Sequence, residues 1–174
     1  MAEITFKGNP FTTSGELPQV GTSAPDFRLV DENLTDRSLK DFQGKRKILY
    51  IVPSLDTSVC SLSTKKFNDV IQRHPQVQLI IASMDSPFAQ KRVCSQEKMT
   101  NLTTLSILRS KEFAETYGVL IKNGPLEGLC ARAILVLDEN NQVLYSELVR
   151  EVTSEPSYET ALKVLLKNPH FSYA

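Results

Sequence analysis

The amino-acid sequence predicts an α/β fold, in which helices flank a central mixed β-sheet. Three observations lead to this prediction. Short apolar segments rich in β-forming residues alternate with segments of helical periodicity, which is typical of α/β proteins. Two late apolar segments, residues 133–138 and 142–148, are joined by a polar turn and predict an antiparallel hairpin. An alternating stretch at about residues 3–14 predicts a separate N-terminal hairpin that turns at Gly8-Asn9-Pro10.

Three strands and a helix are expected in the next part of the chain. Two short strands, near Phe27–Val30 and Thr35–Leu39, are separated by turn residues. The segment KILYIV, residues 47–52, is almost wholly apolar and suits a central strand that is covered on both faces. Helical periodicity then runs from about Ser58 to Arg73. The predicted apolar face of this helix comprises Val59, Cys60, Leu62, Phe67, Val70 and Ile71.

A second buried strand is predicted at Gln76–Met84, and a helix follows it. Ser86 is a suitable N-cap for this helix, and Pro87 suits its first position. Cys94 lies within the same helical segment.

The remaining elements are a short helix, the late hairpin and a closing helix. The segment SKEFAETYGV predicts a helix that ends at Gly118. The late hairpin is expected to turn at Glu139-Asn140-Asn141. The segment SYETALKVLLKN predicts an amphipathic helix, because its apolar residues recur at helical spacing. These residues are Ala161, Leu162, Leu165 and Leu166.

Composition limits the classes of function. The 174 residues favour one domain, residues 1–174, with ordinary globular composition: 41% hydrophobic and 23% charged. Twenty basic residues balance 20 acidic ones, so no basic surface for nucleic acid or an anionic membrane is expected. The N-terminus lacks the apolar region of a signal peptide, and no apolar run approaches the length of a membrane span. We therefore expect a cytoplasmic location.

The chain has three cysteines, Cys60, Cys94 and Cys130, and no pair forms a CxxC motif. This spacing excludes a zinc ribbon and a redox motif of the thioredoxin type. A reducing cytosol also argues against purely structural disulfides. The cysteines therefore either pack as small apolar residues or act chemically.

The segment PSLDTSVC predicts a reactive thiol at the start of a helix. Asp56, Thr57 and Ser58 all favour helix caps, which places Cys60 in the first turn. Unpaired backbone N–H groups and the helix dipole favour an anion there, and a thiolate is the nucleophilic form of cysteine. The Thr57 hydroxyl could bond to the sulfur or to a bound oxygen. Pro53 ends the strand and shields the pocket with apolar ring carbons.

This segment resembles the PxxxTxxC signature of peroxiredoxins. Further segments look like the bacterial thiol peroxidase subfamily of the atypical two-cysteine type, in the same order and spacing over nearly the whole chain. They are FKGNP, GKRKILYIVPSLDTSVC, DSPFAQKRVC, YGV and GPLEGLCARAILVLDENNQVLYSELVREVTSEPSYETALKVL. The resemblance implies a thioredoxin-like fold and a cofactor-free, thiol-dependent peroxidase.

The resemblance also implies roles for individual residues. Cys60 would be the peroxidatic cysteine, which attacks a hydroperoxide and becomes a sulfenic acid. Thr57 would orient the peroxide and Pro53 would shield the sulfur. Arg132, in GLCARA, matches the arginine of the family. An arginine immediately before an apolar strand would point inward only if an anion required it; otherwise it would lie on the surface.

Cys94 matches the resolving cysteine, which would form an intramolecular disulfide with Cys60. Because a disulfide requires Cα atoms within about 7 Å, we expect one or both cysteine-bearing helices to unwind during the cycle. The family further implies reduction by thioredoxin and a homodimer. Cys130 is interpreted as a packing residue, with a minor resolving role as the alternative.

Other functions remain open at this point. One is a peroxide sensor or disulfide relay, and another is a structural or holdase-type module with inert cysteines. Neither His74 nor His170 is placed to pair with Cys60, and no metal-ligand spacing is present. The apolar residues Leu55, Val59 and Leu62 predict an apolar lining, so alkyl and lipid hydroperoxides are expected substrates beside hydrogen peroxide.

Overall fold

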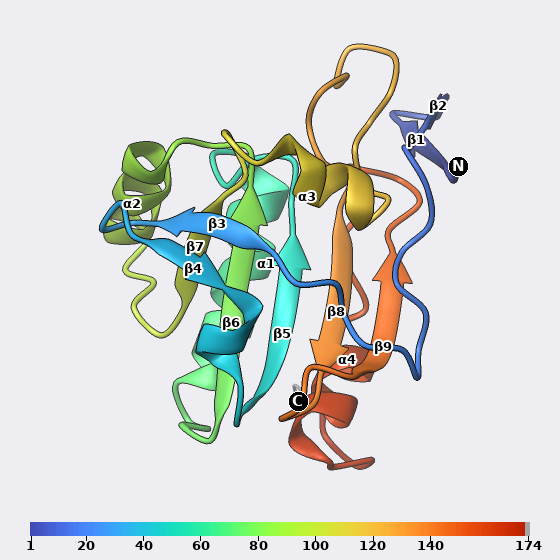
Figure 1. Ribbon diagram of the computed structural model, residues 1–174. Helices are drawn as coiled ribbons and strands as arrows, with labels where there is room; N and C mark the ends of the chain where they lie inside the picture. The colour runs from blue at the N-terminus through green and yellow to red at the C-terminus, as the bar shows by residue number, and fades with distance from the viewer. Residues whose placement is uncertain (173–174) are drawn as a thin grey trace.

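The computed structural model describes residues 1–172 of the chain. Its central element is a seven-stranded mixed sheet, which confirms the predicted fold class (Figure 1). β5 pairs in parallel with β6, and β6 with β7, whereas the other neighbouring strands are antiparallel. In spatial order the strands are β4 (Asp36–Ser38), β3 (Arg28–Asp31), β7 (Thr103–Ser106), β6 (Val77–Ser83), β5 (Arg46–Ile51), β8 (Ala133–Leu137) and β9 (Val143–Leu148).

Helices cover both faces of the sheet, and each face has its own apolar core. On one face of the sheet the core includes residues of α1, α2 and α4. On the opposite face the core includes residues of the 3₁₀ helix η1 and of α3. In Figure 1, α1 lies behind β5 and β6, and α3 lies in front of the sheet. The helices are η1 (Leu39–Phe42), α1 (Ser58–Ile71), α2 (Pro87–Gln96), α3 (Lys111–Thr116) and α4 (Tyr158–Leu166).

β5 is the central strand from which the site is built. Its side chains alternate between the two cores: Ile48 and Tyr50 face the α1 side, and Leu49 and Ile51 face the other side. All four residues are fully buried. The predicted strand that is covered on both faces is therefore confirmed.

The N-terminal hairpin is also confirmed, but its predicted turn is wrong. The hairpin comprises β1 (Glu3–Phe6) and β2 (Asn9–Thr12), with Phe6 paired to Asn9. The turn is Lys7-Gly8, where φ is 51° and 83°. Positive φ at both residues is the geometry that matches the twist of a two-residue hairpin. Asn9 and Pro10 are strand residues instead.

The hairpin is fixed to the C-terminal part of the chain, which brings Phe6 toward the active-site region. Thr5 N donates to Arg150 O at 2.6 Å, and Val152 N donates to Thr5 O at 2.8 Å. The carboxylate of Glu151 accepts from Thr5 Oγ1 at 3.0 Å and from Gly8 N at 3.0 Å. These bonds hold the hairpin beside residues 150–152.

Two elements, one helix face and one helix end differ from the sequence prediction. β7 and η1 are short and carry weak apolar patterns, so neither was predicted. Leu62 was expected on the buried face of α1, but 48% of its surface is exposed. At 100° per residue, Leu62 lies about 200° around the helix from Cys60, so it faces away from the sheet. α1 ends at Ile71, two residues before the predicted end.

The predicted helix end at Gly118 is confirmed. Gly118 has φ 72°; its N–H bonds to Glu115 O, and Val119 N bonds to Ala114 O. This pair of bonds is a Schellman motif, which requires a residue that tolerates positive φ. A Cβ at this position would lie 2.3 Å from Glu16 O, so glycine is required for packing as well.

Candidate active site

Cys60 lies in the first turn of α1, as the sequence predicted. Thr57 is the N-cap, and its Oγ1 accepts a hydrogen bond from Cys60 N at 3.4 Å. The same hydroxyl donates to Ser54 O at 3.1 Å. Thr57 Oγ1 therefore bonds to the backbone on both sides of the helix start. Among the described residues, Thr57 Oγ1 has no hydrogen bond to Cys60 Sγ. This cap fixes the geometry of the turn that presents the thiol.

Arg132 places a buried cation against the sulfur of Cys60. Its Nη1 lies 3.1 Å from Cys60 Sγ. Cys60 is fully buried, and only 2% of the Arg132 surface is exposed. The contact gives the sulfur a positively charged N–H donor in the protein interior, where charge-assisted contacts are strong. The arginine expected from the sequence thus points inward and reaches the sulfur.

Two further acceptors hold the Arg132 guanidinium. Its Nε and Nη2 both donate to Val152 O, at 3.2 Å and 2.9 Å. Its Nη1 also donates to Tyr50 Oη at 3.0 Å. Burial alone would lower the pKa of Arg132, but Tyr50 and Cys60 raise that pKa above its ordinary value. These contacts use four of the five N–H groups of a guanidinium, so one remains for a substrate oxygen.

Tyr50 and Ser63 continue this polar network into α1. Tyr50 Oη and Ser63 Oγ are 2.7 Å apart. Burial raises the pKa of Tyr50 to about 12, although the nearby Arg132 cation acts in the opposite direction. Both residues are fully buried. The sequence analysis treated Tyr50 only as part of an apolar strand and did not identify it or Ser63 as site residues.

An apolar cavity of about 230 Å³ lies at this site. Pro53, Thr57 and Arg132 line it together, so the structure brings these three predicted residues to one place. The remaining lining residues are Phe6, Ser54, Ser58, Val59, Leu126, Leu129, Val152 and Thr153. Phe6 comes from the N-terminal hairpin, which the sequence analysis did not connect with the site.

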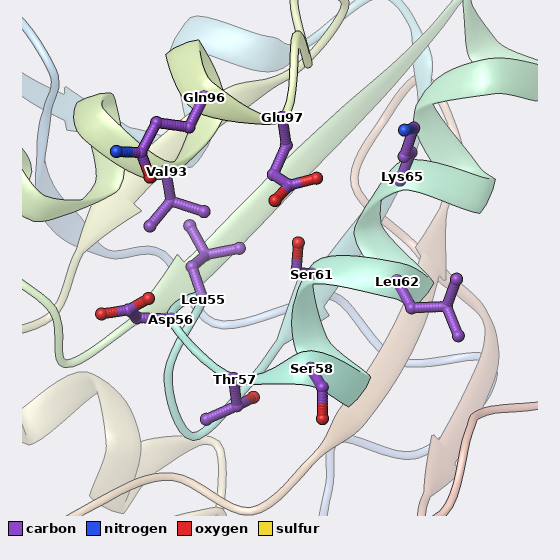
Figure 2. Close-up of a pocket in the computed structure, with 10 residues that line it drawn as sticks. All are labelled: Leu55, Asp56, Thr57, Ser58, Ser61, Leu62, Lys65, Val93, Gln96 and Glu97. Atoms are coloured by element: carbon purple, nitrogen blue, oxygen red, sulfur yellow. The ribbon is translucent and has the colours of Figure 1, made fainter.

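The apolar lining expected from Leu55, Val59 and Leu62 is only partly present. Val59 lines the cavity beside Arg132, but Leu55 and Leu62 line a different cavity. That second cavity, of about 470 Å³, lies between the start of α1 and the end of α2. Figure 2 shows Val93 of α2 and Glu97, the C-cap of this helix, facing side chains at the start of α1 across this space.

Asp85 holds the loop that precedes Cys60, and the sequence analysis did not identify it. Its Oδ1 accepts from Ser54 Oγ at 2.7 Å, and its Oδ2 accepts from Leu55 N at 2.8 Å. Ser83 Oγ also donates to Oδ2 at 2.6 Å. Because Asp85 directly precedes the N-cap of α2, its carboxylate links the Cys60 loop to the start of the Cys94 helix.

Cys94 is a free thiol on α2 and is not bonded to Cys60. Both cysteines belong to the same apolar core. Burial raises the pKa of Cys94 to about 11, and the negative charge of Glu32 adds to this effect. Cys94 lines a third cavity, of about 480 Å³, whereas the cavity between the two helices is lined by its neighbour Val93.

Cys130 lies on the opposite side of the sheet. It is fully buried in the core that includes α3, whereas Cys60 and Cys94 belong to the core that includes α1. Burial raises the pKa of Cys130 to about 12. This placement favours a packing role for Cys130.

The described part of the chain contains no cluster of three or more histidine, cysteine, aspartate or glutamate side chains that could hold a metal ion. None of the helices in residues 1–172 is long and apolar enough to span a membrane.

Comparison with known proteins identifies the family of the chain. A family model described as Redoxin matches residues 19–162. A thiol peroxidase of Leptospira interrogans is 47% identical over 164 residues, which cover 93% of this chain and 96% of the relative.

Solved structures show the same similarity. A peroxiredoxin-like protein from Aquifex aeolicus is 39% identical with a TM-score of 0.87, and the match covers 94% of this chain and 96% of that one. A thiol peroxidase from Chromobacterium violaceum is 28% identical with a TM-score of 0.88, and the match covers 95% of each chain. The fold is thus thioredoxin-like, and the chain belongs to the Redoxin family and, within it, to the thiol peroxidases of the peroxiredoxin superfamily.

Proposed function

We propose that the protein reduces hydrogen peroxide and organic hydroperoxides through the thiolate of Cys60, and that a disulfide with Cys94 and reduction by thioredoxin complete the cycle. Membership of the thiol peroxidases makes the protein a peroxidase that uses a thiol. The observation that carries the assignment to Cys60 is the 3.1 Å contact between Arg132 Nη1 and Cys60 Sγ inside the buried site.

In the first step, the thiolate of Cys60 attacks the terminal oxygen of the hydroperoxide. A sulfur–oxygen bond forms and the oxygen–oxygen bond breaks, so the sulfur loses two electrons and becomes a sulfenic acid. The leaving oxygen takes up a proton and departs as water or an alcohol. The remaining N–H of Arg132 can donate to one peroxide oxygen. The Thr57 hydroxyl gives its hydrogen to Ser54 O and accepts from Cys60 N, so it has one lone pair left to accept from a peroxide O–H.

In the second step, the Cys94 thiol attacks the sulfenic sulfur, which releases water and forms the disulfide. This step requires Cα atoms within about 7 Å, and Cys94 is buried on a folded helix. The cavity between α1 and α2 gives the first turn of α1 or the end of α2 room to move. A dithiol protein of the thioredoxin type would then reduce the disulfide by two successive exchange reactions.

The apolar cavity beside Arg132 supports organic hydroperoxides as substrates. Its wall is formed mainly by carbon atoms of Phe6, Val59, Leu126 and Leu129. An alkyl group would remove this surface from water when it binds, which hydrogen peroxide cannot do. The cavity thus has a polar end for the peroxide and an apolar end for its substituent.

The proposal also includes a homodimer and a cytoplasmic location. Support for the dimer comes from an exposed apolar surface at the start of α2 and beyond β7. Phe88 is 71% exposed and Leu108 is 61% exposed, and Leu34 is 56% exposed nearby. Such a cluster on a soluble protein indicates an interaction site.

Replacing the arginine tests the assignment of Cys60. Arg132→Met should slow oxidation of the reduced protein by hydrogen peroxide on the order of a hundredfold, because it removes a preorganised donor and the cation beside the sulfur. Stopped-flow measurement gives the second-order rate constant. Arg46→Met is the matched control: Arg46 begins β5 and also donates to backbone carbonyls, but those carbonyls belong to Val164 and Leu165 of α4. Equal rates in the two variants, or rapid oxidation of Cys60→Ser, would exclude the proposed site.

Cys94→Ser tests the resolving step. The variant should still react once with peroxide at close to the wild-type rate, but it should not turn over with thioredoxin, because the sulfenic acid has no internal partner. Mass spectrometry should then show Cys60 advancing to sulfinic acid. Cys130→Ala is the control and should keep full turnover. Full turnover of Cys94→Ser would show that another thiol resolves the intermediate.

Phe6→Ala tests the apolar end of the cavity. It should lower the rate constant for cumene hydroperoxide about tenfold through lost apolar contact, while the rate constant for hydrogen peroxide changes little. Phe11→Ala, in the same hairpin but outside this cavity, should leave the ratio of the two rate constants unchanged. If Phe6→Ala leaves the ratio of the rate constants for cumene hydroperoxide and hydrogen peroxide unchanged, the organic substituent does not bind against Phe6.

Phe88→Glu tests the dimer. A carboxylate in place of this exposed apolar ring should shift the protein to a monomer, because burying the charge is unfavourable. Sedimentation equilibrium of the reduced protein measures the change. Val20→Glu, at another exposed apolar position, should keep the dimer. A monomeric wild type would refute the proposed homodimer.

A further inference from the structure

A continuous chain of hydrogen bonds leads from Arg132 into α1. Nη1 of Arg132 donates to Tyr50 Oη at 3.0 Å, and Tyr50 Oη lies 2.7 Å from Ser63 Oγ. Ser63 Oγ in turn lies 2.7 Å from Val59 O and 3.2 Å from Cys60 O. The chain therefore returns to the helical turn that carries the reactive sulfur.

Counting hydrogens gives the direction of each bond. Nη1 carries two hydrogens, one for Cys60 Sγ and one for Tyr50 Oη. Ser63 can give its hydrogen to Val59 O and accept the hydrogen of Tyr50. Burial raises the pKa of Tyr50 to about 12, so the phenol keeps its proton at neutral pH. Every polar group in this buried chain then has a partner.

Tyr50 supplies a constraint on Arg132 that Val152 does not. Val152 O accepts two N–H groups on one edge of the guanidinium, which leaves the plane able to pivot about that oxygen. A second acceptor at Nη1 removes this freedom. Tyr50 is itself rigid, because it lies on the central strand β5 and its ring packs edge-on against Phe67 of α1, with centroids 5.4 Å apart.

We propose that Tyr50 is a positioning residue for the peroxide reaction: its hydroxyl holds Nη1 of Arg132 at the Cys60 sulfur, and Ser63 fixes that hydroxyl to α1. The proposal rests on the proposed function of Cys60. Within residues 1–172, Tyr50 Oη has no hydrogen bond to Cys60 Sγ, so it acts through Arg132. The alternative is that Tyr50 only fills the core and satisfies its own hydroxyl.

Tyr50→Phe removes the hydroxyl and preserves the ring, so it is the direct test. We expect the second-order rate constant for hydrogen peroxide to fall about tenfold, because Nη1 loses an acceptor and the guanidinium can turn from the sulfur. Ser63→Ala should act in the same direction with a smaller effect. Tyr117→Phe is the matched control: Tyr117 is fully buried and donates to Pro25 O, but it belongs to the other core. A Tyr50→Phe rate equal to that of Tyr117→Phe would overturn the proposal.

A double-mutant cycle separates positioning from a structural effect. In an Arg132→Met background, Tyr50→Phe should change the rate less than about twofold, because the group that it positions is already absent. The cycle is repeated with Arg132→Lys, which retains a positive charge without the planar fork. The same tenfold loss in the wild-type and both variant backgrounds would show that Tyr50 acts independently of Arg132 and would overturn the proposal.

Failure of this inference can be distinguished from failure of the proposed function. If peroxide still oxidises Cys60→Ser at the wild-type rate, the proposed function is wrong and the inference falls with it. If oxidation depends on Cys60 and Arg132 but not on the Tyr50 hydroxyl, only the inference is wrong. Denaturation midpoints of Tyr50→Phe and Tyr117→Phe show whether the two phenylalanine variants lose comparable stability.

Discussion

The buried cation of Arg132 beside Cys60 is the interaction on which the site depends. An arginine that is only 2% exposed has lost most of its hydration, and such a charge is tolerated only when its N–H groups are paired. Val152 O and Tyr50 Oη supply neutral acceptors, and Cys60 Sγ supplies the remaining contact. Because neutral acceptors do not cancel the charge, the positive charge of the guanidinium stays directed at the sulfur.

The requirement for these acceptors explains why distant segments converge here. Val152 N bonds to Thr5 O in the N-terminal hairpin, so the segment that holds Arg132 is itself held by β1. The same contact brings Phe6 to the apolar cavity. The alternation of β5 directs Tyr50 toward α1 and Arg132, while its neighbours Leu49 and Ile51 fill the other core. The geometry of the site therefore depends on the register of β5 and on the docking of the hairpin.

The sequence predicted the features that depend on local order but not those that depend on tertiary packing. The helix start at Thr57 was predictable because capping is a local property of polar side chains. The inward direction of Arg132 required the family resemblance, since a lone arginine before a strand is usually exposed. Tyr50 gave no signal, because an aromatic residue fits a buried strand whether or not its hydroxyl has a role. Asp85 accepts from Ser54 and Leu55, about 30 residues earlier, which no periodicity reveals.

The contacts that hold Cys60 in the first turn of α1 would oppose the proposed disulfide with Cys94. If Cys60 is oxidised as proposed, the sulfenic acid replaces the group that Arg132 contacts, so the first turn of α1 would lose part of its stabilisation. Each terminal hydrogen bond then contributes only about 1 kcal/mol, which a favourable disulfide can exceed. Cys94 is protected by burial, and its pKa is raised to about 11, so its thiolate is scarce while α2 stays folded. Local opening would bring the two sulfurs together and also expose Cys94 to water, where its thiolate forms more readily. In the proposed cycle, the resting structure holds Cys60 at Arg132 for peroxide attack, and the altered contact with Arg132 after oxidation would permit the movement toward the disulfide.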